Sequence, residues 1–303
     1  MILPPVTRDE ILQAFGKSFT RPENVRQVSA KPRASSLASC ARQQAYAMAG
    51  TEPDTIGTQG SLLNYDADLT SEQGRVFEGL MERTFETMGI KVVGAQTTLP
   101  DTYPVSGHPD GELDLSNYRQ QALSTGQITH QSLGRQTRWG VEFKHLGRYS
   151  YKKTIINGLR TAHPQYILQA GLYGDALGWD AVLFVVSSQD ASSIRGEATA
   201  ALRNYNRGPT RANRWVVDND WHPKLHIETL EMAEVSGLIP IAHARANWLS
   251  DWMANDSDPK SVRNEYDPEN GQFPCTYCPY LASCLADGDS GYRAPDLPFR
   301  MDD

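Results

Sequence analysis

Three side chains in the middle of the chain combine charges that could act on a phosphate ester. Asp110 opens a short predicted strand in the segment GHPDGELD, and Glu142 and Lys144 lie on a later strand in VEFKH. Alternate residues of a strand point to the same face, so Glu142 and Lys144 share one side of theirs. If Asp110 comes from the neighbouring strand, two carboxylates and one ammonium group converge in a small volume.

Such a group suits a hard divalent cation, because Mg²⁺ and Mn²⁺ prefer oxygen ligands. Asp110, Glu142 and the backbone carbonyl of Phe143 could supply those ligands. A bound metal ion would polarise a phosphoryl group and lower the pKa of its water. Lys144 would position that water or stabilise the negative charge that develops. The pattern therefore points to hydrolysis of a phosphodiester bond.

Each of these fragments alone is compatible with an ordinary structural role. A Glu-x-Lys pair on a strand is usually a surface ion pair, and HPDG is usually a turn in which His108 has a local role. Two facts favour a site. The strand is otherwise largely apolar, and charged residues are rarely buried there without a partner. The two fragments also occur in the right order, with helical segments around them.

The four cysteines form a second constellation. Cys275, Cys278 and Cys284 lie within ten residues of each other, and Cys40 lies 235 positions before the first of them. Four thiolates suit either zinc or a [4Fe–4S] cluster. A zinc ribbon normally has two C-x-x-C pairs, so the lone fourth cysteine favours the cluster. Free thiols packed as small apolar side chains are the alternative.

A four-cysteine centre would also have a structural effect. It would tie the N-terminal helix to the C-terminal tail and so reduce the entropy that closing this long loop costs. We expect that role to be structural, and a redox-sensing role stays open.

Apolar periodicity, capping residues and turn residues predict the elements that position these groups. Helices are predicted over residues 7–19, 35–50, 71–89, 149–162, 164–178, 191–207 and 227–255, the last interrupted at Pro240. Strands are predicted over residues 91–99, 111–115, 137–146, 180–188 and 214–218, and loops over 51–70 and 120–136. The apolar stripe of helix 71–89 is expected to consist of Val76, Phe77, Leu80, Met81, Phe85 and Met88.

This order predicts an α/β core with a mixed sheet flanked by helices. Three parts are expected: a helical N-terminal segment 1–70 that carries one cysteine, a core 71–226, and a C-terminal segment 227–303 with a helix and the other cysteines. The 303 residues and the 39% of apolar side chains are sufficient for a sizeable core.

The net charge of −7 argues against a surface that attracts nucleic acid everywhere, because phosphate binding depends on Lys and Arg. It leaves room for a local basic track beside a carboxylate cluster. No apolar run approaches the ~20 residues that a membrane-spanning helix needs. The N-terminus lacks the pattern of a signal peptide. We therefore expect a cytoplasmic protein without membrane contact.

The motifs resemble, in their order, those of the RecB-type PD-(D/E)XK nucleases. The series runs G-x-x-x-E (Gly74 and Glu78), GHPDG, V-E-F-K and Q-A-G-L-Y. The resemblance implies the fold of that class, with a restriction-endonuclease-like core. It also implies metal ligands, a catalytic lysine and two residues that line the active site and the DNA path. Carried over, these are Glu78, Asp110 and Glu142 for the metal, Lys144 for catalysis, and Gln169 and Tyr173 for the lining.

Two of these motifs leave an alternative open. Many CRISPR-associated members have histidine where this chain has Glu78, and Glu82 is a fallback one turn later on the same face. Gln169 and Tyr173 could instead be a packing pair on an amphipathic helix, and Gln165 is a candidate accessory residue one turn earlier.

The cysteine layout resembles that of the AddB nuclease domain and the Cas-four family. The similar segments are SSLASCARQQAY around Cys40 and FPCTYCPYLASC at the other end. With the nuclease motifs, the resemblance spans residues about 35–285. It implies a [4Fe–4S] cluster held by all four cysteines.

A short basic stretch with aromatic residues follows the Glu-x-Lys strand. It could grip the DNA backbone and stack on single-stranded bases, although a solvated helix face is the alternative. Its members are Arg148, Lys152, Lys153 and Arg160, with Tyr149 and Tyr151 between them. No segment resembles a helix that reads the major groove, so little sequence specificity is expected.

These features together imply a Mg²⁺- or Mn²⁺-dependent deoxyribonuclease with an iron–sulfur cluster. We expect an exonuclease that acts on single- or double-stranded DNA ends, in recombination, repair or CRISPR spacer processing, of phage or CRISPR-associated type. A recombination or CRISPR protein partner and a homo-oligomer are left open. The alternatives are a structure-specific endonuclease on the same core, and a catalytically inactive DNA-binding scaffold stapled by the cluster or by zinc.

Overall fold

The computed structural model describes residues 28–54, 60–118, 120, 138–189, 225–269, 275 and 278–299. The predicted helices at 7–19 and 191–207 and the predicted strand at 214–218 lie outside these residues. Nearly all of the predicted loop at 120–136 lies outside them as well. No described helix is both long enough and apolar enough to cross a membrane.

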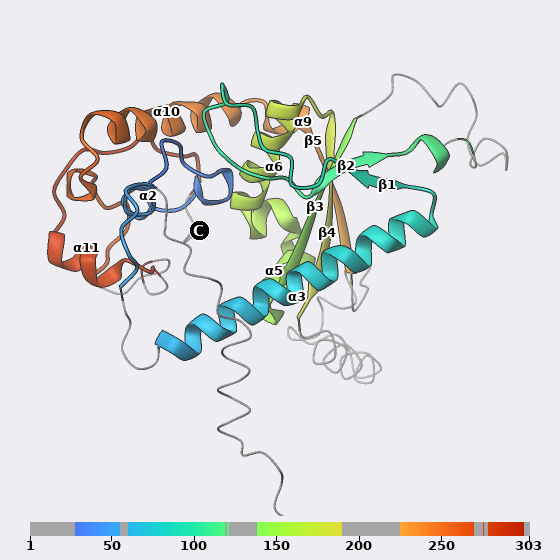
Figure 1. Ribbon diagram of the computed structural model, residues 1–303, viewed down its shortest axis with the longest axis horizontal. Helices are drawn as coiled ribbons and strands as arrows, with labels where there is room; N and C mark the ends of the chain where they lie inside the picture. The colour runs from blue at the N-terminus through green and yellow to red at the C-terminus, as the bar shows by residue number, and fades with distance from the viewer. Residues whose placement is uncertain are drawn as a thin grey trace, which may run out of the picture.

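A five-stranded mixed sheet forms the centre of the molecule (Figure 1). Its strands lie side by side in chain order: β1 (Lys91–Val93), β2 (Gly111–Asp114), β3 (Trp139–Leu146), β4 (Ala181–Ser188) and β5 (Leu225–Glu231). The β3–β4 pair is parallel and the other three pairs are antiparallel. A parallel pair needs a long crossover connection, and two helices between β3 and β4 provide it.

Helices cover the sheet and extend the molecule beyond it. They are α2 (Ala41–Met48), α3 (Gly60–Thr87), α5 (Arg148–Ala162), α6 (Pro164–Leu177), α9 (Met232–Val235), α10 (Ile239–Asn255) and α11 (Leu281–Asp287), with 3₁₀ turns η1 (Ala34–Ser36) and η4 (Pro259–Ser261). The mixed α/β core with flanking helices was predicted, and the structure confirms it at this level.

One face of the sheet packs against α3. Phe77, Met81 and Phe85, one turn apart, form a buried stripe on this helix. The stripe meets a layer of sheet residues, which are Leu113, Val141, Phe143 and Val185. The other three residues predicted for this stripe, Val76, Leu80 and Met88, are exposed. The predicted helix is present, and a single sheet face covers a narrower arc of it than its apolar residues occupy.

The opposite face packs against the crossover helices. Val182, Phe184 and Val186 of β4 point into a larger apolar cluster that also contains Leu168 and Leu172 of α6. Alternation along β4 explains this split, because Val185 belongs to the α3 side. On β3, Glu142 and Lys144 alternate with Val141 and Phe143 of the α3 side, so they point towards the crossover helices.

Four predicted elements differ in extent. The segment predicted as one helix over 35–50 is instead η1 followed by α2, with Cys40 at the N-cap position of α2. Residues 60–70, predicted as loop, belong to α3. The strand predicted over 91–99 ends at Val93, because Gly94 and Gln96 take positive φ values of 64° and 59°.

The fourth difference concerns residues 227–255, predicted as one long helix. The first part pairs with β4 as strand β5, from Leu225 opposite Ser187 to Glu231 opposite Ala181. Backbone hydrogen bonds to a partner strand thus outweigh the helical pattern that the segment shares with α10. Pro240 lies in the first turn of α10, where its missing N–H costs nothing. The predicted division at 226/227 falls inside β5 and that at 70/71 inside α3, and the three-part organisation stays a prediction.

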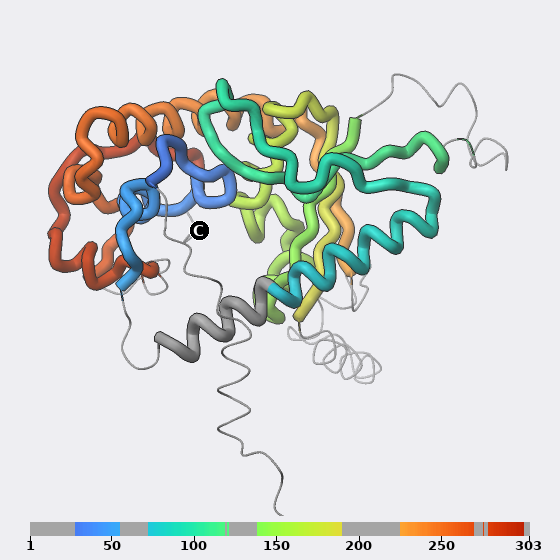
Figure 2. The backbone as a smooth tube through the Cα atoms, viewed as in Figure 1, coloured from blue at the N-terminus to red at the C-terminus, as the bar shows by residue number. Residues whose placement is uncertain are grey.

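Two segments from opposite ends of the chain lie together beside the sheet (Figure 2). Arg42 of α2 is fully buried and donates hydrogen bonds to the backbone carbonyls of Val262, Gly288, Lys260 and Ser290. The hydroxyl of Tyr46 donates to Asp287 at 2.7 Å, and its ring stacks on Tyr280 with centroids 5.1 Å apart. We call this contact between residues 40–54 and 260–290 the terminal joint.

Candidate functional site

The predicted carboxylate–lysine group is assembled on the middle of β3, beside the start of β2. Glu142 and Lys144 share a face of the strand, and Lys144 Nζ donates to Glu142 Oε2 at 2.8 Å. Asp110 immediately precedes β2, and its Oδ2 accepts a hydrogen bond of 2.7 Å from the backbone N–H of Phe143. The β2–β3 pairing that the structure describes runs from Gly111 opposite Val141, so Asp110 comes beside Glu142 and Phe143. The two carboxylates and the ammonium group therefore converge as the sequence predicts.

Glu142 is the most constrained member of this group. Only 1% of the residue is exposed, and its Oε1 has no hydrogen-bond partner among the described residues. Burial raises the pKa of Glu142 to about 7, although the charge of Lys144 opposes that rise. Buried polar atoms almost always have a partner. A carboxylate oxygen that is shielded and unpaired is therefore suited to receive a cation.

Lys144 is held as an ammonium ion. Burial by itself would lower its pKa, but the charges of Glu142 and Asp110 outweigh that effect and raise it. The ring of Tyr166 adds a contact from α6, with Lys144 Nζ 5.2 Å from the ring centroid. Tyr166 in turn lies beside His163, with ring centroids 5.1 Å apart. Lys144 is thus positioned by Glu142 and, we infer, by the face of Tyr166.

Glu78, on α3, interacts with the group through its charge. Burial raises the pKa of Glu78. The charge of Asp110 raises it further, and that of Lys144 opposes the rise. Burial likewise raises the pKa of Asp110. The fallback residue, Glu82, also contributes a charge near Glu78 and raises its pKa further. Of the helical candidates, Glu78 is the one whose charge interacts with Asp110 and Lys144.

The residues predicted to line the site lie on α6. Gln169 and Tyr173 are buried, and Gln169 Nε2 donates to the Tyr173 hydroxyl at 3.2 Å. Burial and the charge of Glu142 raise the pKa of Tyr173 to about 12. Gly107 allows this arrangement, because a Cβ at that position would lie 2.7 Å from the Tyr173 ring. The first glycine of GHPDG, Gly107, thus leaves space for the ring of Tyr173 from the later motif.

Two further candidates have local partners. Gln165 Nε2 lies 3.4 Å from His163 Nδ1, so its amide is directed at the ring of His163. Phe143 enters the site through its N–H, which bonds to Asp110, and its carbonyl stays a predicted ligand.

The basic stretch after β3 is divided by the fold. Arg160 donates to Thr229 O at 3.0 Å and to Glu234 at 2.7 Å, so it joins α5 to the β5–α9 connection. Tyr151 is fully buried, which rules out stacking on a base and corrects that expectation. Tyr149 is 82% exposed at the start of α5. Arg148, Lys152 and Lys153 remain predicted DNA contacts on the same helix.

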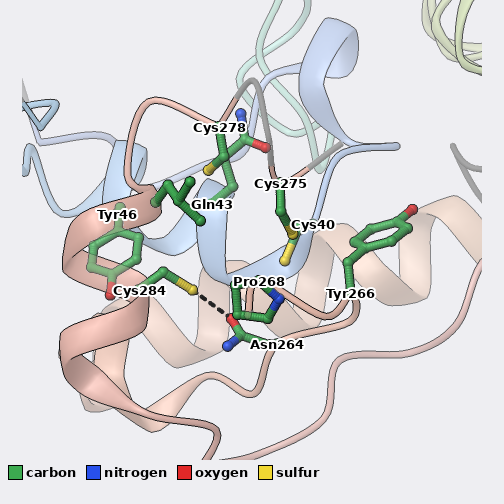
Figure 3. A pocket seen from close by; sticks show the side chains of 10 residues that line it. Cys40, Gln43, Tyr46, Asn264, Tyr266, Pro268, Cys275, Cys278 and Cys284 are labelled. Carbon is green, nitrogen blue, oxygen red and sulfur yellow. Dashed lines mark hydrogen bonds between the residues drawn. The ribbon is translucent and has the colours of Figure 1, made fainter. Parts of the chain in front are cut away.

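All four cysteines line one pocket in the terminal joint (Figure 3). Asn264, Tyr266 and Tyr46 contribute to its wall. The four thiols are free. Burial raises the pKa of each thiol. Within the described ranges, no three Cys, His, Asp or Glu side chains already stand in a metal-binding arrangement.

The two donor sets nevertheless match different metals. Carboxylate oxygens beside a lysine suit Mg²⁺ or Mn²⁺, whereas four thiols around one pocket suit zinc or an iron–sulfur cluster. The unpaired Oε1 of Glu142 supports the first assignment, and the shared pocket supports the second. Both donor sets are of the type that the sequence predicts, and the metals themselves stay predictions.

Sequence patterns did not identify three residues that the structure places at these sites. Tyr166 precedes Gln169 by three positions and Tyr173 by seven, so a search for residues on one helix face would have included it. Arg42 follows Cys40 by two positions, so its place near the cysteines could be seen in the sequence, although its partners could not. Asn264 reaches the cysteine pocket only through the folding of distant segments, and no local pattern around it indicates a site.

Comparison with known proteins adds little. No protein-family model matches this chain, and no curated protein matches it significantly. Among solved structures, the crystal structure of SSO0001 is similar with a TM-score of 0.40 and 10% sequence identity, over 92% of this chain and 98% of the other. The function therefore has to be inferred from the side chains themselves.

Proposed function

We propose that this protein is a metal-dependent deoxyribonuclease of the PD-(D/E)XK class. The observation that carries the proposal is Glu142, a buried carboxylate beside Asp110. Its Oε2 is paired with Lys144, while its Oε1 has no partner among the described residues. A structural ion pair alone does not explain why the buried Oε1 of Glu142 has no hydrogen-bond partner in the described part of the chain. A divalent cation bound at that oxygen would explain it.

Each residue has a distinct role in this proposal. Asp110, Glu142 and Glu78 would hold Mg²⁺ or Mn²⁺, which when bound polarises the phosphodiester and activates water. Lys144 orients that water or stabilises the charge on the phosphoryl oxygens. Gln169 and Tyr173 form the wall beside Glu142. Hydrolysis adds water across one P–O bond, so one new end carries the phosphate and the other the hydroxyl.

We also propose that the four cysteines hold a [4Fe–4S] cluster and that the enzyme acts from DNA ends. The shared pocket supports a four-sulfur centre, with zinc as the alternative. The preference for ends, a role in recombination or CRISPR spacer processing, and a protein partner or homo-oligomer rest on the resemblance of the motifs.

The decisive experiment compares linear and circular DNA in the presence of Mn²⁺. We expect the anaerobically purified protein to degrade the linear form, and Lys144→Ala to bind DNA without cutting it. Lys91→Ala is the matched control, because Lys91 is an exposed lysine of β1 in the same sheet. It should cut as the wild type does.

Other outcomes separate the alternatives. Cleavage of covalently closed circles would replace the exonuclease with an endonuclease on the same core. DNA binding without cleavage by fully metallated wild-type protein would favour the inactive scaffold and would contradict the proposed activity.

A further inference from the structure

The side-chain amide of Asn264 lies against Cys284, with only one of its two polar atoms hydrogen-bonded within the part of the chain that the structure describes. Its Oδ1 is 2.9 Å from the sulfur of Cys284, and its Nδ2 is shielded from solvent without a hydrogen-bond partner among the described residues. Figure 3 shows the amide at the wall of the cysteine pocket, pointing at Cys284. Leaving a buried amide N–H without a partner is unfavourable, so this position needs a physical reason.

The backbone around Asn264 is held firmly in place. Its own N–H donates to Asp289 Oδ1 at 3.3 Å. The next residue, Glu265, accepts from the N–H of Ala41 at 2.8 Å and forms a two-pronged ion pair with Arg245 at 2.6 Å. Asn264 is therefore fixed between the Cys40 segment and the Cys284 helix, and only its side-chain torsions are free to change.

The chemistry of the sulfur decides which end of the amide can face it. A thiol donates its hydrogen, so the carbonyl oxygen of Asn264 faces the Cys284 thiol. A sulfur bound to a metal has no hydrogen and can only accept. A half-turn of the amide then brings Nδ2 to the sulfur, and a neutral contact becomes a stronger hydrogen bond to a charged acceptor.

We infer that Asn264 donates a hydrogen bond to the metal-bound sulfur of Cys284 and thereby tunes the charge and reduction potential of the cysteine centre. The inference rests on the proposed four-cysteine centre and is independent of the nuclease activity. Arg42 reinforces it, because its guanidinium lies close enough to Cys284 to oppose the rise that burial gives to the pKa of the thiol.

The direction in which Asn264 changes the reduction potential follows from charge. Reduction by an external donor such as dithionite adds one electron to the cluster and makes its sulfurs more negative. The amide hydrogen bond then becomes stronger, so Asn264 favours the reduced form and raises the potential. No proton has to move, since the hydrogen stays on the amide nitrogen.

The test uses full-length protein reconstituted anaerobically with iron and sulfide. Asn264→Leu removes the donor and keeps the size, and Asn264→Asp keeps the shape and replaces the donor with a negative charge. We expect the midpoint potential to fall from wild type to Leu and further to Asp. For the Leu variant we expect about a tenfold change in the reduction equilibrium, or about 59 mV for one electron. Gln43→Leu, which removes another amide from the same pocket wall, should stay near wild type.

Several results would overturn the inference. Wild-type potentials in both Asn264 variants at full iron content would show that the hydrogen bond is not made. An equal shift in Gln43→Leu would assign the effect to the general polarity of the pocket.

If the centre takes zinc instead, the same contact is measured by competition with a chelator. Asn264→Leu should then lose zinc about tenfold more readily, and unchanged affinity would contradict the inference. A wild-type protein that binds neither iron nor zinc at its cysteines would overturn the four-cysteine centre together with it. Loss of DNA cleavage alone would count only against the nuclease proposal.

Discussion

The carboxyl group of Glu142 gains a proton more readily in the folded protein than in water, since burial raises its pKa from 4.5 to about 7. The pKa values of Asp110 and Glu78 are raised as well, with burial as the main cause. Three carboxyl groups that resist ionisation next to one another indicate a site that favours added positive charge. Lys144 supplies part of that charge, and the proposed metal would supply the rest.

This arrangement makes the stability of the metal-free protein depend on pH. A raised pKa stabilises the fold fully below the unfolded value of 4.5, and that stability is lost as pH rises through about 7. The difference between these two pKa values corresponds to as much as about 3 kcal/mol. We therefore expect the free energy of unfolding, measured with urea after EDTA treatment, to fall between pH 5 and pH 8.

Two additions make this measurement specific. Glu142→Gln should flatten the dependence on pH, because the amide does not ionise. Mn²⁺ should restore stability most at the higher pH, where protons no longer compete for the carboxylates. An identical slope in the wild type and the Gln variant would contradict the assignment.

Tyr166 provides a second test at the level of one residue. Its ring faces Lys144 Nζ at 5.2 Å, a contact worth about 0.5–2 kcal/mol. Tyr166→Leu removes the aromatic face, and we expect kcat for DNA hydrolysis to fall about threefold to thirtyfold, with KM almost unchanged. Tyr166→Phe keeps the face and should retain most of the activity. Equal losses in both variants would point to the hydroxyl or to packing instead.

At the level of elements, α5 contains a break that the sequence pattern did not predict. Gly158 has φ 74° and ψ 158°, a conformation open almost only to glycine. The N–H of the next residue, Leu159, donates to Glu228 Oε2 at 2.7 Å, and His226 lies 3.2 Å from the same oxygen. Strand β5 thus supplies the cap for the second half of α5, which ends just before α6 and its site residues.

Replacing Gly158 should show how much this break matters. A Cβ there would make only ordinary van der Waals contacts, with Glu228 oxygens 3.7 and 3.8 Å away, so the cost of Gly158→Ala comes from the backbone conformation. We expect a loss of about 1–3 kcal/mol in the free energy of unfolding. Gly237→Ala is the control, because Gly237 has open space and no positive φ. A Gly158→Ala variant as stable as wild type would mean that α5 can straighten without cost.

Across the molecule as a whole, the two ends of the chain are already joined by hydrogen bonds that need no metal. Arg42 donates to carbonyls on both sides of the C-terminal cysteines, and Tyr46 reaches Asp287. Asp54 accepts from the backbone N–H of Ala282 at 2.6 Å and from the Ser283 hydroxyl at 2.5 Å. These hydrogen bonds already hold the terminal joint together, so a cluster would only increase its stability.

The separate contributions of the hydrogen bonds and of the cysteine centre to stability can be measured. We expect a variant with serine at all four cysteine positions to remain folded, with the far-UV circular dichroism of the wild type and a lower unfolding midpoint. Arg42→Met should be more damaging, at roughly 3 kcal/mol or more, because it leaves several buried carbonyls unpaired. Limited proteolysis should then release the C-terminal segment. An unfolded serine variant would show that the metal centre, and not the hydrogen bonds, holds the ends together.

Features that depend on local geometry could be predicted from the amino-acid sequence. Glu142 and Lys144 face the same way because side chains alternate along a strand, and α6 presents Gln169 and Tyr173 on one face because they are one helical turn apart. The spacing of Cys275, Cys278 and Cys284 also follows from the chain alone. The mixed sheet with its flanking helices was predictable for the same reason, since each period of apolar residues is short-ranged.

Which distant groups meet depends instead on the tertiary fold. Strand β5 exists because β4 offers it a full ladder of partners, against the helical pattern of its own residues. Tyr166 faces Lys144, and Asn264 faces Cys284, because the fold packs distant segments together. No local sequence pattern in either segment predicts these contacts. Burial raises the pKa of Glu142, and burial is a property of the assembled fold. Periodicity is local and so can be seen in a sequence, whereas the energy of such contacts arises only when remote segments are brought together.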